Sequence, residues 1–393
     1  MKQRVGLVRN IKYAALQGLY WMIACVSIVF ASVFLLARGY TNAEIGTVMA
    51  AGYIVGMLLQ PLVSAAADRA RRLNATAVLA LAGLATAAAV CGLVVFPARS
   101  AALTVSYVLF MAFQLVLQPL VNAYCFFLET PETPILFGIA RGVGSLCWGI
   151  MSAVLGLLCD RYGTGVLAPA ALILIAALMA LLFLCRHEGT ARAPMPVAEH
   201  ASGRTSFALS RCFLFLLLGN TFLFFGHAMI DNFPYQVITN VGGTSAQMGV
   251  FCAYAAMLEI PALFLFDRIR KRFSCEQLLR FGAFFFLVKS VALWLVRTLA
   301  GVYLANAFQA ISFALFVPAA VRYAGETAGN RSANSAQSLV TATTSAGNIL
   351  SCVLGGLLID NAGVSGMLAV GAAASVVGAS FVLFGVREKK PET

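Results

Sequence analysis

The chain has 393 residues, of which 61% are hydrophobic and only 11% are charged, and its mean hydropathy is +0.89. Water-soluble domains carry roughly a quarter charged residues and about half apolar ones, so this composition excludes a water-soluble enzyme, a nucleic-acid-binding domain and a disordered scaffold. The formal net charge of +12 is the charge expected from the basic cytoplasmic loops of a membrane protein.

Twelve apolar segments are each long enough to cross a bilayer as a helix, which requires roughly 20 residues. The first segment follows residues 2–12, which include the basic residues Lys2, Arg4, Arg9 and Lys12. It is longer than the core of a signal peptide and no cleavage pattern follows it, so we expect it to remain as a membrane helix. In chain order the expected helices cover residues 14–37, 43–66, 76–96, 101–128, 138–159, 166–185, 212–237, 245–266, 276–297, 301–323, 333–359 and 365–384.

A polar segment over residues 186–211, rich in Arg, Pro, Ser and Ala, separates the sixth expected helix from the seventh. It predicts a cytoplasmic linker between a six-helix half over residues 1–185 and a second half over residues 212–393. Loops on the side of the two termini carry 20 Lys and Arg residues, whereas the opposite loops carry 4. The positive-inside rule therefore predicts that both termini are cytoplasmic, and it explains the basic charge without a nucleic-acid partner.

Two motifs recur between the halves at nearly the same offset. Residues 68–72, DRARR, end the second expected helix, and residues 267–271, DRIRK, end the eighth one, 199 residues later. The pattern G-L-L-x-D-x-x-G begins at Gly156 and again at Gly356, 200 residues later. Matches at a common offset indicate that the second half repeats the first.

Shorter repeats lie inside each half. The aspartates of the two motifs are 92 residues apart in the first half and 93 apart in the second, the length of one three-helix unit. Capping boxes formed by Thr41 with Glu44 and by Thr244 with Gln247 are 203 residues apart. Because three is odd, successive units are inverted in the membrane. Inverted repeats within two parallel halves are typical of alternating-access transporters.

Six plus six helices, with charged loops after the second and the eighth, resemble the major facilitator superfamily. The loop signature of that superfamily is G-x-x-x-D-[RK]-x-G-[RK]-[RK]; Ser64 and Arg71 stand where its two glycines would be, as Arg270 does in the second copy. Residues 50–69 and 137–148 resemble helices 2 and 5 of the lactose permease branch, the latter through F-G-x-A-R-x-x-G. The resemblance implies an all-α fold of twelve transmembrane helices that carries an oligosaccharide or a nucleoside with protons.

The same resemblance suggests which residues contact the solute. The sugar-binding glutamate of the permease falls on Asn122, and its helix 5 matches at Arg141 and Trp148. The helix 10 histidine and proton-carrying glutamate of the permease fall on Gln309 and Ser312, so neither galactoside specificity nor the permease's own proton route is implied. The expected solute-binding residues are Asn122, Arg141, Trp148, Gln118 and Gln309.

Ionisable side chains inside the expected helices cost roughly 2.5–3.5 kcal/mol each to insert, so each of them requires a reason. His227 and Asp231 are four residues apart and share a helical face. Glu259 lies near Pro261, where the helix is expected to kink, and Lys289 on the next helix pairs with it if the two faces meet. We expect proton coupling at Glu259 in preference to Asp231. The alternative is that these charges form structural ion pairs that permit insertion.

Four charged residues end helices on the expected cytoplasmic face and are candidates for gating: Asp68, Arg69, Asp267 and Arg268. Charge-assisted hydrogen bonds from these residues to neighbouring helices would hold the cytoplasmic side shut. The alternative is that the charges only set the topology.

No Walker phosphate-binding loop occurs, and the ten cysteines are scattered without metal-ligand spacing. We therefore expect no cofactor, no metal site and no enzymatic activity. The prediction is a monomeric secondary active transporter of the plasma (inner) membrane, which moves a small polar organic solute, sugar-like or nucleoside-like, by proton symport. An efflux antiporter of amphipathic compounds is the alternative in the same fold. An intramembrane enzyme or a non-transporting sensor is the alternative of a different class.

Overall fold

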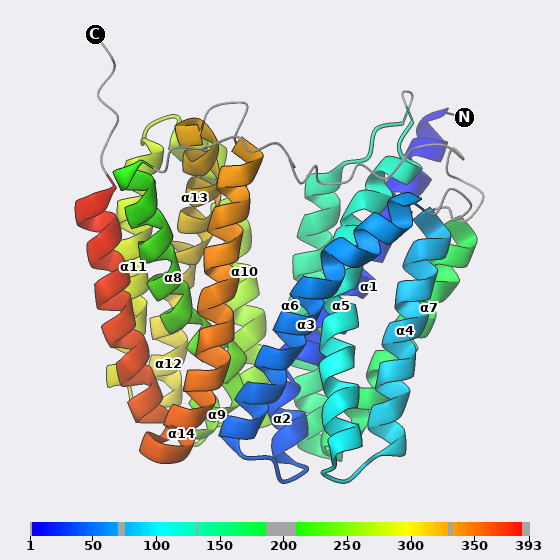
Figure 1. Ribbon diagram of the computed structural model, residues 1–393, viewed down its shortest axis with the longest axis horizontal. Coiled ribbons are helices and arrows are strands. Elements are labelled where there is room, and N and C mark those ends of the chain that lie inside the picture. Colours follow the sequence, from blue (N-terminus) through cyan, green and yellow to red (C-terminus); the bar gives the residue numbers. More distant parts are fainter. Residues whose placement is uncertain (1, 70–74, 131–132, 186–209, 329–332, 387–393) are drawn as a thin grey trace. The chain divides into compact units, whose positions relative to one another are not determined.

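The computed structural model describes residues 2–69, 75–130, 133–185, 210–328 and 333–386 (Figure 1). These ranges are helical apart from turns and one isolated β-bridge between Thr130 and Thr133. The side chains of Asp68, Arg69 and Asp267 lie outside the described residues, as do residues 186–209 of the linker expected over 186–211.

Eleven helices among the described residues are long and apolar enough to cross a membrane. The last of them, over Ser335–Gly385, has 51 residues, which is the length of two spans. Gly363 interrupts it with φ 70° and ψ 176°, and Figure 1 shows the helix turning back on itself there, first orange and then red. Twelve spans result, as the sequence predicts.

The chain divides into two compact units. One consists of Met1–Glu199 with Ser245–Ala253, and the other of His200–Thr244 with Tyr254–Thr393.

The first unit is built from α1 and the helices that follow it up to residue 185. α1 packs against α5, α6 and α7, while α5 also packs against α3 and α4 (Figure 1). The elements are α1 (Lys2–Ile28), α2 (Ala31–Leu36), α3 (Asn42–Arg69), α4 (Ala75–Val95), α5 (Ala101–Leu128), α6 (Phe137–Tyr162), η1 (Thr164–Val166) and α7 (Leu167–Cys185). Large aromatic side chains fill its interior, among them Tyr13, Tyr20, Phe30, Tyr107, Phe110 and Tyr124.

The helix α1 begins well before residue 14, where the sequence predicts its start. Its polar first turns are held by the segment that joins α5 to α6. Arg9 Nη1 donates to Thr133 Oγ1 at 3.2 Å, and Asn10 Nδ2 donates to the carbonyl of Pro134 at 3.1 Å. The N–H of Leu136 donates back to Asn10 Oδ1 at 2.7 Å. Tertiary hydrogen bonds, which hydropathy does not report, therefore extend this helix beyond its apolar part.

The second unit is organised around α14, which packs against α8, α11 and α13. The elements are α8 (Arg211–Asn232), α9 (Pro234–Thr239), α10 (Ser245–Arg270), α11 (Cys275–Leu295), α12 (Leu299–Asn306), η2 (Ala307–Ala310), α13 (Phe313–Ala328) and α14 (Ala333–Gly385). A core rich in phenylalanine fills the unit, with Phe213, Phe224, Phe286 and Phe316 buried in it. The first nine residues of α10 are grouped with the first unit.

Three spans that the sequence predicts as single helices are broken. The first is divided into α1 and α2 at Val29 and Phe30, and the seventh into α8 and α9 at Phe233, which precedes Pro234. The tenth is divided into α12 and α13 by the 3₁₀ turn η2. Proline lacks the N–H that would continue a helix, but neither proline nor glycine lies near η2. There Ser312 Oγ donates to the carbonyl of Phe308 at 2.8 Å, a contact that bends helices.

The repeated motif of the two halves has the same backbone in both copies. Gly163 ends the first copy with φ 76° and ψ 177°, and Gly363 ends the second with φ 70° and ψ 176°. Residues other than glycine rarely adopt this backbone conformation, because their Cβ atom would clash with the neighbouring backbone. The repeat is thus visible in backbone geometry as well as in sequence.

Candidate functional site

A hydrogen-bonded chain of three polar side chains lies inside the second unit. Lys289 Nζ donates to Gln309 Oε1, and Gln309 Nε2 donates to Glu259 Oε1 at 2.7 Å. The three residues come from α11, η2 and α10. Lys289 is 1% exposed and Gln309 is 3% exposed, while Glu259 is half-buried. The faces of Lys289 and Glu259 therefore meet, through the amide of Gln309.

Chemistry sets the direction of this chain. An ammonium group has three donors and no acceptor, so the oxygen of the Gln309 amide has to face Lys289. Its nitrogen then faces Glu259, whose oxygen accepts. Both hydrogen bonds are charge-assisted when the lysine and the carboxylate are ionised, which makes them stronger than bonds between neutral groups. The sequence places Gln309 among the solute-binding residues, whereas the structure places it between the two candidate coupling residues.

A second acid–base pair lies on α8. His227 Nε2 is 3.2 Å from Asp231 Oδ2, the distance of an ion pair, although the angles are not those of a hydrogen bond. The histidine side chain is 3% exposed and the aspartate side chain 55%. The rings of Phe286 and Phe313 lie 5.4 and 5.2 Å from the imidazole. The helical face that the sequence predicts for this pair is present, with the histidine buried and the acid exposed.

The two groups of polar residues interact through Lys289. The carboxylates of Asp231 and Glu259 are both close enough to act electrostatically on its ammonium group, and His227 is close enough to be affected by Lys289. Buried charges are stable only when they are paired and hydrogen-bonded. The pair on α8 and the hydrogen-bonded chain of three residues thus lie near one buried cation, without a described hydrogen bond or ion pair that joins them.

In the first unit, Arg141 is held against the indole ring of Trp21. The guanidinium carbon lies 3.9 Å from the ring centroid, and Arg141 Nη1 donates to Ser145 Oγ at 3.1 Å. Trp148 packs edge-on against the same indole, with centroids 5.8 Å apart at 66°. A Cβ at Gly144 would lie 2.4 Å from Trp21 Cδ1, so the indole reaches α6 only because this residue is glycine.

Asn122 on α5 contacts α1, the helix that Arg141 on α6 also contacts. Gln17 Nε2 donates to Asn122 Oδ1 at 3.0 Å, and Tyr13 Oη donates to the carbonyl of Asn122 at 3.2 Å. Gln17 and Trp21 are one helical turn apart on α1. The structure thus connects Asn122 and Arg141, which the sequence predicts as solute-binding residues, to adjacent turns of α1.

Sequence reasoning missed the contribution of α1 to this cluster. Gln118 is half-buried on α5, one turn from Gln114, and Gln114 Nε2 donates to Tyr20 Oη at 2.9 Å. A signal was present, because polar and aromatic residues recur at helical spacing inside the first apolar segment. These residues of α1 are Tyr13, Gln17, Tyr20 and Trp21.

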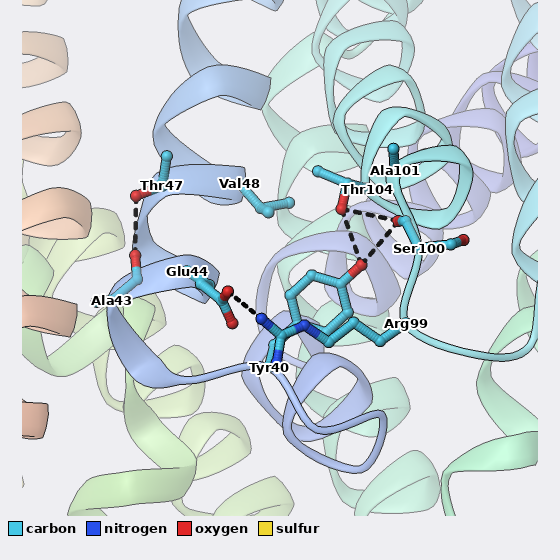
Figure 2. A pocket seen from close by; sticks show the side chains of 9 residues that line it. All are labelled: Tyr40, Ala43, Glu44, Thr47, Val48, Arg99, Ser100, Ala101 and Thr104. Carbon is cyan, nitrogen blue, oxygen red and sulfur yellow. Dashed lines mark hydrogen bonds and ion pairs between the residues drawn. The ribbon is translucent and has the colours of Figure 1, made fainter.

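An open hollow of about 500 Å³ lies where the N-termini of α3 and α5 meet (Figure 2). Glu44 forms an ion pair with Arg99 across it, and the hydroxyl groups of Tyr40 and Thr104 share a hydrogen bond at 2.8 Å. The capping box predicted at Thr41 is confirmed. Glu44 Oε2 accepts a hydrogen bond from the Thr41 N–H at 2.9 Å, and Thr41 Oγ1 accepts one from the Glu44 N–H at 3.3 Å. Glu44 thus caps α3 and also pairs with Arg99 in the loop before α5.

Of the four candidate gating residues, only the side chain of Arg268 is described, and it is exposed in the last turn of α10. Its neighbour Arg270 lies 3.6 Å from Glu326 on α13, and Arg322 lies 3.3 Å from the same carboxylate. The basic end of α10 is therefore linked to α13. Within the described ranges, no three His, Cys, Asp or Glu side chains gather closely enough to hold a metal ion.

The chain was compared with protein-family models and with known proteins. The model described as the MFS_1 like family matches residues 13–368. The chain belongs to this family of the major facilitator superfamily. As a major facilitator protein it is a multi-pass membrane transporter of a small-molecule solute and not an enzyme.

Relatives of this major facilitator chain agree with that assignment. It is 30% identical over 332 residues to a maltose permease of Geobacillus stearothermophilus, which covers 81% of this chain and 80% of the permease. The crystal structure of the nucleoside transporter NupG matches with a TM-score of 0.74 at 15% identity, over 97% of this chain and all of that one. An auto-inhibited POT family peptide transporter matches with a TM-score of 0.77 at 14% identity, over 97% of both chains. These two structures confirm the twelve-helix major facilitator fold.

Proposed function

We propose that this protein is a proton-coupled symporter that carries a small polar solute, specifically a sugar such as maltose, into the cytoplasm by alternating access. The observation that carries the proposal is the buried chain from Lys289 through Gln309 to Glu259. A symporter requires a carboxylate that is ionised at one stage and protonated at another. Glu259 is such a carboxylate by position, since it is half-buried and is linked through Gln309 to the buried cation Lys289.

The solute-binding part of the proposal concerns the first unit. Arg141 presents a planar set of donors that suits the hydroxyl groups of a sugar, and its position is fixed by Trp21 and Ser145. Trp148 adds a flat apolar ring, and such rings bind the less polar face of a sugar. Asn122 supplies a donor and an acceptor, with Gln118 one turn away. The maltose permease relative supports a sugar as the solute.

In the cell, the protein would be a monomer in a bacterial-type plasma (inner) membrane, with both termini in the cytoplasm. Movement of the halves over residues 1–185 and 212–393 would expose the solute to one side of the membrane at a time. Asp68 and Arg69 in one half, and Asp267 and Arg268 in the other, would close the cytoplasmic side. Asp231 with His227 is the second candidate for coupling.

Purified protein in proteoliposomes tests the proposal. An inward proton gradient should drive accumulation of radiolabelled maltose, and a protonophore should abolish it. Uridine serves as the comparison solute, and accumulation of uridine alone would replace the sugar by a nucleoside. Accumulation of neither solute, together with proton-driven export of an amphipathic dye, would contradict the proposal in favour of efflux.

A further inference from the structure

We infer that Gln309 is a positioning residue for proton coupling, which links the protonation state of Glu259 to the broken segment of the tenth membrane span. The inference rests on the proposed role of Glu259. It assigns to this amide a task that neither Lys289 nor Glu259 performs alone. The observations that carry it are the direction of the hydrogen bonds and the position of Gln309 in the helix.

Gln309 lies in the one-turn break of its span. α12 ends at Asn306, η2 covers Ala307–Ala310, and α13 begins at Phe313. The hydrogen bonds of a 3₁₀ turn have poorer geometry than those of an α-helix, and 3₁₀ turns inside helices often mark hinges. A side chain that is held on both sides by hydrogen bonds therefore projects from a segment that can change its conformation at low cost.

The amide has one acceptor side and one donor side, and both are engaged. Lys289 occupies the oxygen and Glu259 the nitrogen. Rotation of the amide by 180° would place its N–H groups against the ammonium group of Lys289, where two donors face each other. The amide therefore cannot adapt to a change at Glu259 by turning over while Lys289 remains charged.

Protonation of Glu259 changes this contact in either of two ways. A proton on Oε1 makes a second donor opposite Gln309 Nε2, so the two groups separate. A proton on the other oxygen leaves a neutral acceptor, and the hydrogen bond loses the strengthening that a charge provides, about half of its strength. In both cases the hold on η2 weakens.

The other ionisable groups around Lys289 come from α8. Asp231 carries a second carboxylate, 3.2 Å from His227 on the same helix. Neither of these side chains is hydrogen-bonded to Gln309, whose described partners are Lys289 and Glu259. The change that follows protonation is concentrated at the bond between Gln309 and Glu259, and so at η2.

Two variants of Gln309 separate this role from a merely structural one. Gln309→Met keeps the length of the side chain and removes both hydrogen bonds. Gln309→His can accept with one ring nitrogen and donate with the other, so it can preserve the link. Ser290→Ala is the matched control, because Ser290 is the next residue after Lys289, is 4% exposed, and accepts a hydrogen bond from Ser375 at 2.8 Å.

The assay uses reconstituted full-length protein with radiolabelled maltose and records both gradient-driven accumulation and exchange at equal pH across pH 5.5–8.5, roughly the range in which a perturbed carboxylate titrates. For Gln309→Met we expect accumulation to fall at least about ten-fold, since the loss of one charge-assisted hydrogen bond corresponds to about a ten-fold change. The rate of exchange should stay within about two-fold of the wild type, and its pH dependence should shift. Gln309→His should restore accumulation, and Ser290→Ala should resemble the wild type.

Wild-type accumulation and an unshifted pH profile in Gln309→Met would overturn the inference, as would equal loss of exchange and accumulation in both Gln309 variants. Glu259→Gln, measured in parallel, distinguishes the two levels. If it uncouples transport and Gln309→Met does not, the inference fails and the proposed function stands. If Glu259→Gln accumulates maltose normally, the inference fails together with the coupling role of Glu259, and coupling passes to Asp231. The proposed symport fails only if the wild type itself does not accumulate maltose under a proton gradient.

Discussion

The guanidinium carbon of Arg141 lies 3.9 Å from the centroid of the Trp21 ring, so one face of the arginine is covered by an aromatic side chain from another helix. A cation over an indole ring gains about 0.5–2 kcal/mol, more where water is excluded. The contact fixes the plane of the guanidinium group and leaves its in-plane donors to other partners. An arginine held in this way presents a defined direction to a bound solute, and the first two predictions follow from it.

Arg141→Lys should weaken maltose binding by at least about ten-fold, because lysine keeps the charge but loses the planar donor set and stacks less well on indole. The KM for uptake and the affinity in a direct binding assay both report this change. Arg161→Lys, at the exposed end of the same helix, is the control and should behave as the wild type. Unchanged affinity in Arg141→Lys would remove the arginine from the solute site.

Gly144→Ala should have a similar effect, because its Cβ would lie 2.4 Å from Trp21 Cδ1 and the indole would have to move off Arg141. We expect KM to rise several-fold, with a smaller change in the maximal rate, since about 1 kcal/mol of stacking corresponds to about five-fold. Gly142→Ala is the matched control on the same helix, where an added Cβ meets nothing within 4 Å. Equal KM values for the two alanine variants would contradict the importance of the stack.

Glu259→Gln should abolish proton-driven accumulation of maltose while exchange at zero gradient continues, because exchange requires no deprotonation. The exchange rate of this variant should also lose the part of its pH dependence that comes from this carboxylate. Asp231→Asn should retain accumulation. The reverse pattern would assign coupling to Asp231.

Cysteine labelling checks the topology. In a chain whose ten native cysteines are replaced, a cysteine at Arg99 should react with a membrane-impermeant maleimide only from outside the cell. One at His200 should react only from the cytoplasm. Arg99 is well suited because its side chain is half-exposed beside the hollow shown in Figure 2. Labelling of Arg99→Cys from the cytoplasmic side alone would invert the proposed orientation.

The sequence predicts the twelve spans to within a few residues for most of them, because the bilayer imposes a length of apolar chain that hydropathy detects directly. The fourth expected span, which is α5 (Ala101–Leu128), has its predicted ends. The breaks at Phe30 and over residues 307–312 were not predicted, because neither place contains a proline or a glycine. Only the break before Pro234 had a signal in the sequence.

The candidate site was predicted in part. The cost of burying charge identified Glu259 and Lys289, and the resemblance to the lactose permease branch identified Arg141. The structure surrounds each of them with partners. Trp21 was missed because its significance comes from a contact between helices more than a hundred residues apart, which no local pattern reports. The sequence predicts Gln309 as a solute-binding residue, and only the structure shows its hydrogen bonds to Lys289 and Glu259. A neutral amide between two charges is recognisable only once both neighbours are known.

Gly163 and Gly363 end two copies of one eight-residue motif with nearly identical backbone angles. We therefore expect that one copy of the motif can replace the other. A chain in which residues 156–163 are replaced by the sequence of residues 356–363 should fold and transport, because the graft brings its own left-handed glycine to the same place. The two copies have diverged at the positions between the shared residues, yet both retain the one residue without a Cβ where the chain reverses. The side chains of a repeated motif can therefore change, whereas the glycine with positive φ that ends each copy has to remain.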